Sequence, residues 1–257
     1  MQISLLAILF LLQVPRVPPL DQVLASVSRN VKDFQDLLPD FVCDEKITST
    51  VYESGKIRKM KIVNSIFTAV QKPSDSPGTG RVAFTENREI TAIDRRSVRK
   101  GTKMPPLPVG MFGGFSSLLS MTLSPKMLDV HSYELEQELD QNGRLVIHFR
   151  TRKNQQSLRS ILNGEYLIDN DTGTAWIDVQ KMQVVRLQRD FLMLPIKLKW
   201  LRDSVDYGPV TIDGREFWLP HTMRSDAGEW DAKDTSTFIA EYTNCKKFVA
   251  DIKFVPH

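Results

Sequence analysis

The sequence predicts an α+β fold, in which a mostly antiparallel β-sheet carries a small number of helices. Residues of similar polarity recur at every second position through most of the chain, which places successive side chains on opposite faces of a strand. Turn sequences separate these stretches, and no regular succession of strand, helix and strand is present. The stretch Gly173–Phe191 shows the pattern most clearly: Ala175 and Ile177 alternate before a turn, and Val185 and Leu187 alternate after it.

Two segments depart from this alternation and predict helices. From Leu20 to Leu38, apolar residues recur at spacings of three and four, as on one face of an amphipathic helix, and Pro39 ends the segment. The second segment, residues 109–122, carries four apolar side chains at helical spacing: Phe112, Phe115, Leu118 and Leu119. We expect it to pack on a sheet face. The alternative is a mobile lid over an apolar cavity, with Gly110, Gly113 and Gly114 as hinges.

Short turn sequences predict the order of the hairpins. Strands at residues 41–53 and 56–72 are joined by Ser54 and Gly55, and the second of them places Met60, Ile62, Ile66 and Val70 on one face. Further turns are predicted near Asp94 and Arg95, at Asn142 and Gly143, and at Asp213 and Gly214. Residues 72–80 are predicted to form a loop and residues 153–164 a polar link.

The N-terminal residues predict export. An unbroken apolar run from Ile3 to Leu12 is too short to cross a bilayer, which needs about 20 residues, but it suits the apolar region of a signal peptide. We therefore expect residues 1–19 to be a signal peptide with a proline-rich junction, and residues 20–257 to be one domain of an exported, periplasmic protein without a transmembrane helix. The two cysteines, Cys43 and Cys245, are then either one disulfide or two buried thiols.

Composition and motifs exclude several classes of function. A net charge of +3 is too balanced for a nucleic-acid-binding protein. None of the four histidines lies in a metal-binding or catalytic motif, and no nucleophile elbow or phosphate-binding loop is present. The segment Asp169–Gly173 lacks the spacing of a calcium loop and predicts a turn. We therefore expect no cofactor, no metal and no enzymatic activity.

One segment has an unusual concentration of basic residues. Arg95–Lys103 holds five basic residues in nine, which either form the solvated end of a hairpin or contact anionic lipid headgroups or another acidic partner. An acidic stretch with Glu229, Asp231 and Asp234 is predicted to be a surface patch.

The strand sequences between Gly173 and Phe248 resemble those of periplasmic carrier and sorting proteins for outer-membrane lipoproteins. The likeness is in G-T-A-W-I-D, V-V-R-L, I-D-G-x-x-F-W-L-P and F-x-x-E-Y-x-N. It implies an open half-barrel, with the N-terminal and mid-chain helices covering the concave apolar face.

The resemblance also implies a function. It suggests that an apolar groove of the curved sheet binds a lipid or a lipoprotein acyl chain. Eight residues are the candidate lining of this groove: Phe112, Phe115, Leu118, Leu119, Met60, Ile62, Val185 and Leu187. The alternative is an envelope protein that binds a protein partner, as a sensor or scaffold with a filled core.

Overall fold

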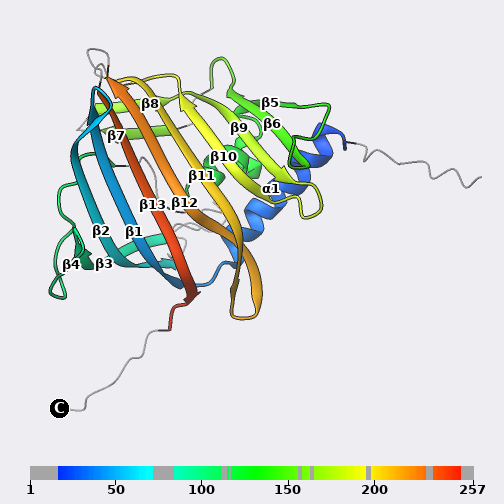
Figure 1. Ribbon diagram of the computed structural model, residues 1–257. Helices are drawn as coiled ribbons and strands as arrows, with labels where there is room; N and C mark the ends of the chain where they lie inside the picture. The colour runs from blue at the N-terminus through cyan, green and yellow to red at the C-terminus, as the bar shows by residue number, and fades with distance from the viewer. Residues whose placement is uncertain are drawn as a thin grey trace, which may run out of the picture.

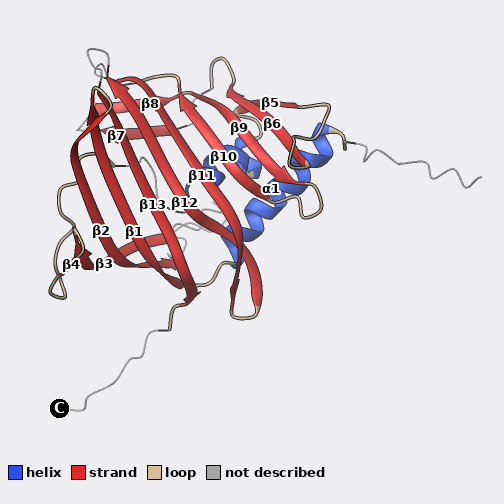
Figure 2. Cartoon of the chain, in the orientation of Figure 1, coloured by secondary structure: helices blue, strands red, loops and turns tan. Residues whose placement is uncertain are grey.

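The structure is a computed structural model that describes residues 17–71, 84–110, 115, 117–155, 158–162, 165–194, 198–229 and 234–249. Within these ranges, eleven strands form one open antiparallel sheet in the order β4-β3-β2-β1-β13-β12-β11-β10-β9-β6-β5. The sheet is strongly curved, and the helices lie on its concave side (Figure 1; Figure 2). The predicted α+β half-barrel is confirmed.

Three helical segments and thirteen strands make up the described part of the chain. The helices are α1 (Leu20–Leu37), α2 (Ser117–Leu123) and the short 3-10 helix η1 (Pro125–Met127). The first strands are β1 (Phe41–Glu53), β2 (Lys56–Gln71), β3 (Phe84–Ile93), β4 (Arg96–Ser97), β5 (His131–Leu135) and β6 (Arg144–Thr151). The others are β7 (Leu158–Leu162), β8 (Glu165–Asp169), β9 (Asp171–Asp178), β10 (Val184–Phe191), β11 (Leu198–Ile212), β12 (Arg215–Glu229) and β13 (Asp234–Lys247).

Helix α1 covers the concave face with one apolar stripe. Val23, Val27, Val31 and Phe34 are buried, at the spacing of three and four that the sequence predicts. The backbone N–H of Leu38 closes the last turn on the carbonyl of Phe34. Within the described ranges, no helix has the length and apolar content needed to cross a bilayer.

The sheet brings the two ends of the described chain together. Strand β1 pairs with β13, although 202 residues separate Cys43 from Cys245, and a disulfide joins these two residues. The hairpin turns lie where the sequence places them. Ser54, Asp94 and Asp213 all have positive φ angles at these turns, a conformation that Asp tolerates better than most residues.

One strand lies where the sequence predicts a polar link, and the face of β2 that carries Met60, Ile62, Ile66 and Val70 is the outer one. The polar link predicted at residues 153–164 contains strand β7, which pairs with β8 in a separate two-stranded sheet. In β2, the inward residues are Val63, Phe67 and Ala69, which are buried, whereas Met60 and Ile66 are exposed. The strand therefore faces the core with its odd-numbered residues, because these lie opposite the buried odd-numbered residues of β1.

Some expectations fall outside the described residues. These are residues 1–16 of the signal peptide and junction predicted at residues 1–19, the whole loop predicted at residues 72–80, Phe112 with its neighbouring glycines Gly113 and Gly114, and Asp231 of the acidic stretch.

Candidate functional site

Aromatic side chains line one half of the concave face. Phe41 of β1, Phe67 of β2 and Tyr242 of β13 all point inward, since they occupy buried positions in neighbouring strands. Phe115, which immediately precedes the α2 region, places its ring between them. Its centroid lies 4.7 Å from that of Tyr242, 5.1 Å from that of Phe67 and 5.3 Å from that of Phe41. These are the separations of directly packed aromatic rings, so Phe115 fills the centre of an aromatic floor.

Phe115 and α2 together form a cover over this floor. Leu118, Leu119 and Leu123 of α2 are buried in the same hydrophobic core as Phe115. The cover also contacts α1, where the amide of Gln35 donates a hydrogen bond of 2.9 Å to the hydroxyl of Ser120. The cover therefore lies between the curved sheet and the N-terminal helix.

The cover is attached to the sheet through side chains. Glu86 of β3 accepts a hydrogen bond of 2.6 Å from the backbone N–H of Phe115. Tyr133 of β5 donates one of 2.6 Å to the carbonyl of Thr122. Upstream of the cover, the hydroxyl of Ser49 bonds both the N–H and the carbonyl of Val109, at 2.9 and 2.7 Å. These hydrogen bonds join the cover to the sheet through side chains, in addition to the burial of its apolar residues in the core.

A buried ionic cluster lies beside the aromatic floor. The carboxylate of Glu45 is fully buried and accepts hydrogen bonds from Ser65, at 2.6 Å, and from Nε of Arg88, at 2.9 and 3.0 Å. Arg88 also stacks over Phe67 and lies 3.5 Å from Glu86. One guanidinium thus faces two carboxylates on the inner surface of the sheet.

The environment of this cluster shifts the pKa values of Glu86 and Tyr242. Burial raises the pKa of Glu86, while Arg88 and the Phe115 N–H partly oppose the shift. Burial, together with the neighbouring charge of Glu45, raises the pKa of Tyr242. Both side chains are therefore biased towards their uncharged forms next to the apolar floor.

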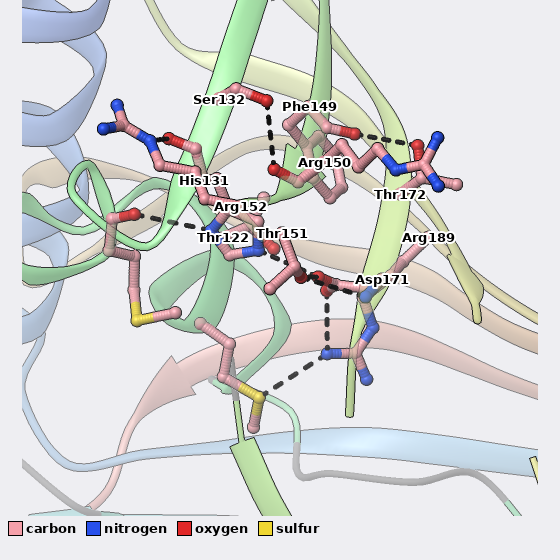
Figure 3. Close-up of polar contacts among 12 residues, drawn as sticks. Thr122, His131, Ser132, Phe149, Arg150, Thr151, Arg152, Asp171, Thr172 and Arg189 are labelled. Atoms are coloured by element: carbon pink, nitrogen blue, oxygen red, sulfur yellow. Dashed lines mark hydrogen bonds and ion pairs between the residues drawn. The ribbon is translucent and has the colours of Figure 1, made fainter. Parts of the chain in front are cut away.

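A second buried ionic cluster lies at the other half of the sheet (Figure 3). Asp171 of β9 accepts hydrogen bonds from the hydroxyl of Thr151, at 2.6 Å, and bonds Nε2 of His131 at 2.8 Å. Arg189 of β10 lies 3.6 Å from Asp171 and 3.8 Å from Asp203 of β11. Burial opposes ionisation of Asp171, but the hydrogen bonds with His131 and Thr151 and the charge of Arg189 outweigh it and hold its pKa below the usual value.

The second cluster is also in contact with the cover. Nη1 of Arg189 lies 3.9 Å from the sulfur of Met121 in α2, and Nδ1 of His131 lies 3.4 Å from the carbonyl of Met127 in η1. His131, Asp171 and Arg189 are almost fully buried. Of the three, only Arg189 contacts the cover, whereas His131 contacts η1, and none of them is open to a substrate from solution.

The structure brings together only some of the residues that the sequence predicts to line the groove. Phe115, Leu118, Leu119 and Leu187 belong to one buried core. Met60 is 46% exposed and Ile62 shares its outer face, so these two residues do not line the groove. Val185 is half-buried at an irregularity in the pairing of β10 with β9.

Sequence reasoning missed the floor and the polar residues at its edge. Phe41 and Phe67 lie on the buried face of β1 and β2, and the correct inward phase of β2 would have identified Phe67. Glu86 and Arg88 lie on the inward face of β3, and the exposed residues Asn87 and Glu89 alternate with them. The sequence does not reveal this, because charged residues are expected on the outward face of a strand.

The outer face carries a hollow of a different character. An open depression of about 520 Å³ spans β13, β1, β2 and β3, and its lining includes Asp44, Lys46, Asn64, Ile66 and Glu241. Lys46 and Glu241 form an ion pair of 2.7 Å across it.

Comparison with known proteins finds distant structural likeness. No family model and no curated protein matches the chain. Among solved structures, the chain is similar to a DUF1329 family protein from Desulfovibrio piger, at 12% identity and a TM-score of 0.41, over 91% of this chain and 95% of that chain. It is also similar to a LolA superfamily protein from Nitrosomonas europaea, at 7% identity and a TM-score of 0.41, over 91% and 96%.

The open, curved sheet with helices on its concave side is the layout that the resemblance of the strands between Gly173 and Phe248 implies. The fold is therefore described from the strands of this chain itself, and any ligand has to be inferred from its side chains.

Proposed function

We propose that the protein binds the acyl chain of a lipid or lipoprotein on its concave face, in the space that Phe115 and α2 occupy in this structure. It acts as a carrier or receptor without catalysing a reaction. In the bound form the cover moves away from the sheet, and the acyl chain takes the place of the Phe115 ring. The observation that carries this proposal is an aromatic floor beneath a short helical cover that is joined to the sheet through side chains.

The geometry supports an exchange between Phe115 and a ligand. The Phe115 ring packs on three aromatic side chains, so its departure would expose a large apolar surface to water, which is unfavourable. An acyl chain would cover the same surface and offset that cost. On opening, the cover exchanges its polar contacts for contacts with water, and the largest of these costs, for the bond between Glu86 and Phe115, is about 1.5–3 kcal/mol.

The proposal includes export. A disulfide such as Cys43–Cys245 persists in oxidising compartments, and the apolar run Ile3–Leu12 suits a signal peptide. Both features favour a protein that works outside the cytoplasm, where membrane lipids and lipoproteins are accessible to it.

Lipid content tests the proposal directly. Protein purified from its native envelope is extracted with organic solvent, and mass spectrometry measures the lipid released per protein. We expect about one acyl lipid per chain, more in Phe115→Ala, which vacates the floor, and less in Phe115→Trp. Phe217→Ala removes a buried ring from another part of the core and is the control. Absence of lipid from both the wild type and Phe115→Ala would contradict acyl-chain binding.

A second candidate function, binding of an envelope protein, has one observation in its favour. Leu192, Met193 and Trp200 are exposed next to a small separate apolar cluster of Phe191, Leu201 and Ala227. Exposed apolar groups that lie close together are typical of protein interfaces. Cross-linking in the envelope that yields a stoichiometric protein adduct through this end of the sheet, without bound lipid, would favour this function.

A further inference from the structure

One edge of the sheet has a charge opposite to that of the rest of the chain. Residues 53–61 and 89–104, which form the β1–β2 turn and the β3–β4 region, contain nine basic and three acidic residues, a net charge of +6. The rest of the chain has 25 basic and 28 acidic residues, a net charge of −3. The overall charge of +3 therefore conceals a strong separation of charge. We call these two segments the basic edge.

Strand pairing brings the two segments of the basic edge together. Ile93 of β3 pairs with both Val63 of β2 and Arg96 of β4. The carboxylate of Asp94 bonds the backbone N–H of Ile62 at 3.0 Å and the ammonium of Lys61 at 2.7 Å. Figure 1 shows β2, β3 and β4 together at one margin of the sheet.

Most of the positive charge of the basic edge is not neutralised. Arg58, Lys61 and Lys100 form ion pairs with carboxylates, and those of Arg58 and Lys100 are long, at 3.8 and 3.9 Å. Six exposed basic residues form no ion pair within the described part of the chain: Lys56, Lys59, Arg95, Arg96, Arg99 and Lys103. Their charges are available to an anionic partner.

Apolar side chains are exposed among these charges. Ile57 is 58% exposed, Met60 is 46% exposed and Met104 is 37% exposed. A membrane interface accommodates both components, because basic residues contact lipid phosphates while apolar side chains enter the boundary of the acyl chains. The phosphate backbone of a nucleic acid offers no comparable site for Ile57 or Met60.

We propose that the basic edge is a docking surface for a membrane that contains anionic phospholipid. The segment that carries its charges also leads to the cover, since Met104 is five residues before Val109, whose backbone is bonded to Ser49. The proposed membrane binding does not require a bound acyl chain. It can therefore be tested separately from acyl-chain binding on the concave face.

Flotation with lipid vesicles tests the proposal on the full chain. We expect binding to vesicles of phosphatidylcholine mixed with phosphatidylglycerol, weak binding to vesicles of phosphatidylcholine alone, and release by salt. The triple substitution Arg95→Glu, Arg96→Glu and Arg99→Glu is expected to reduce binding to the anionic vesicles by at least about tenfold. Ile57→Asn with Met60→Asn is expected to reduce the binding that remains at high salt.

The control makes the same change of charge elsewhere. Arg29→Glu, Arg150→Glu and Lys153→Glu replace three exposed basic residues on α1, on β6 and after β6. Binding of this control within about twofold of wild type assigns docking to the basic edge. Three results would overturn the proposal. These are an equal loss of vesicle binding in the two triple variants, equal binding of the wild type to both vesicle types, and tighter binding to a DNA oligonucleotide than to the anionic vesicles. Circular dichroism establishes that both triple variants are folded.

Discussion

The backbone N–H of Phe115 donates a hydrogen bond of 2.6 Å to the carboxylate of Glu86. The residue that fills the aromatic floor is therefore held by a charge on the strand beneath it, and that charge is itself paired with Arg88 at 3.5 Å. Hydrogen bonds to an ionised acceptor are about twice as strong as neutral ones. Glu86 thus controls how firmly the cover rests on the sheet.

Removing Glu86 is expected to loosen the cover. In Glu86→Ala the Phe115 N–H loses its acceptor, which costs about 1.5–3 kcal/mol of the free energy that keeps the cover closed. Hydrogen exchange in the peptides that contain α2 should then be faster by about tenfold to a hundredfold. Glu86→Gln keeps an acceptor and should fall between Ala and the wild type.

The matched control for this change is Glu89→Ala, which removes an exposed carboxylate from the same strand. If Glu86→Ala leaves exchange in α2 unchanged, or if Glu89→Ala accelerates it equally, the Glu86–Phe115 bond does not hold the cover.

Glu86 also gives stability a specific dependence on pH. Its pKa in the folded protein is raised above the usual value of 4.5, chiefly by burial, so in the window above pH 4.5 the folded state binds more protons than the unfolded state. The contribution of Glu86 to the free energy of unfolding therefore rises as pH falls from neutral towards 4.5. We expect the difference in this quantity between the wild type and Glu86→Gln to increase in the same direction.

Urea unfolding at a series of pH values measures that difference, and taking it against Glu86→Gln cancels the contributions of the other groups. A difference that increases as pH rises would mean that the pKa of Glu86 is lowered in the folded protein, contrary to the expected effect of burial.

Arg189 is expected to be essential for stability. It is 2% exposed and is the guanidinium that faces both Asp171 and Asp203. Arg189→Met leaves buried carboxylates without this cation, which typically costs about 3–5 kcal/mol. Arg186→Met removes a guanidinium from the same strand that is 39% exposed and paired with Asp206, and should cost less than about 1 kcal/mol. Urea denaturation compares the two, and similar losses would show that the buried cluster contributes little.

The disulfide is expected to stabilise the sheet where β1 meets β13. Because it closes a loop of 202 residues, its removal should lower the free energy of unfolding by about 4–5 kcal/mol. The double substitution Cys43→Ala and Cys245→Ala, measured by urea unfolding, tests this. Dithiothreitol should destabilise the wild type to a similar extent and leave the double variant unaffected. An unchanged midpoint in the double variant would contradict the expectation.

The sequence predicts the architecture well because the fold depends on local patterns. The stripe of α1 and the turns at Ser54, Asp94 and Asp213 are fixed by neighbouring residues, and each lies where it is expected. Strand β7 is not predicted, because its five residues lie within a polar segment. The inward phase of β2 is ambiguous in sequence, because both faces of this strand carry apolar residues and only pairing with β1 decides between them.

The candidate site is predictable only in part. Helical spacing groups Phe115, Leu118 and Leu119, and the structure buries all three in one core. The floor beneath them joins Phe41, Phe67 and Tyr242, and the last of these is contributed by a strand about 200 residues away in sequence from the first. Partners so distant are set by the order of strands in the sheet, which local patterns do not specify.

Photocross-linking with a fatty acid that carries a diazirine on its acyl chain tests the central claim most directly. Acyl-chain binding beneath the cover predicts one adduct per chain, mapped by mass spectrometry to the floor residues Phe41, Phe67 and Tyr242, and competed by unlabelled fatty acid. Adducts that lie on the outer face of the sheet, or that unlabelled fatty acid does not reduce, would contradict it.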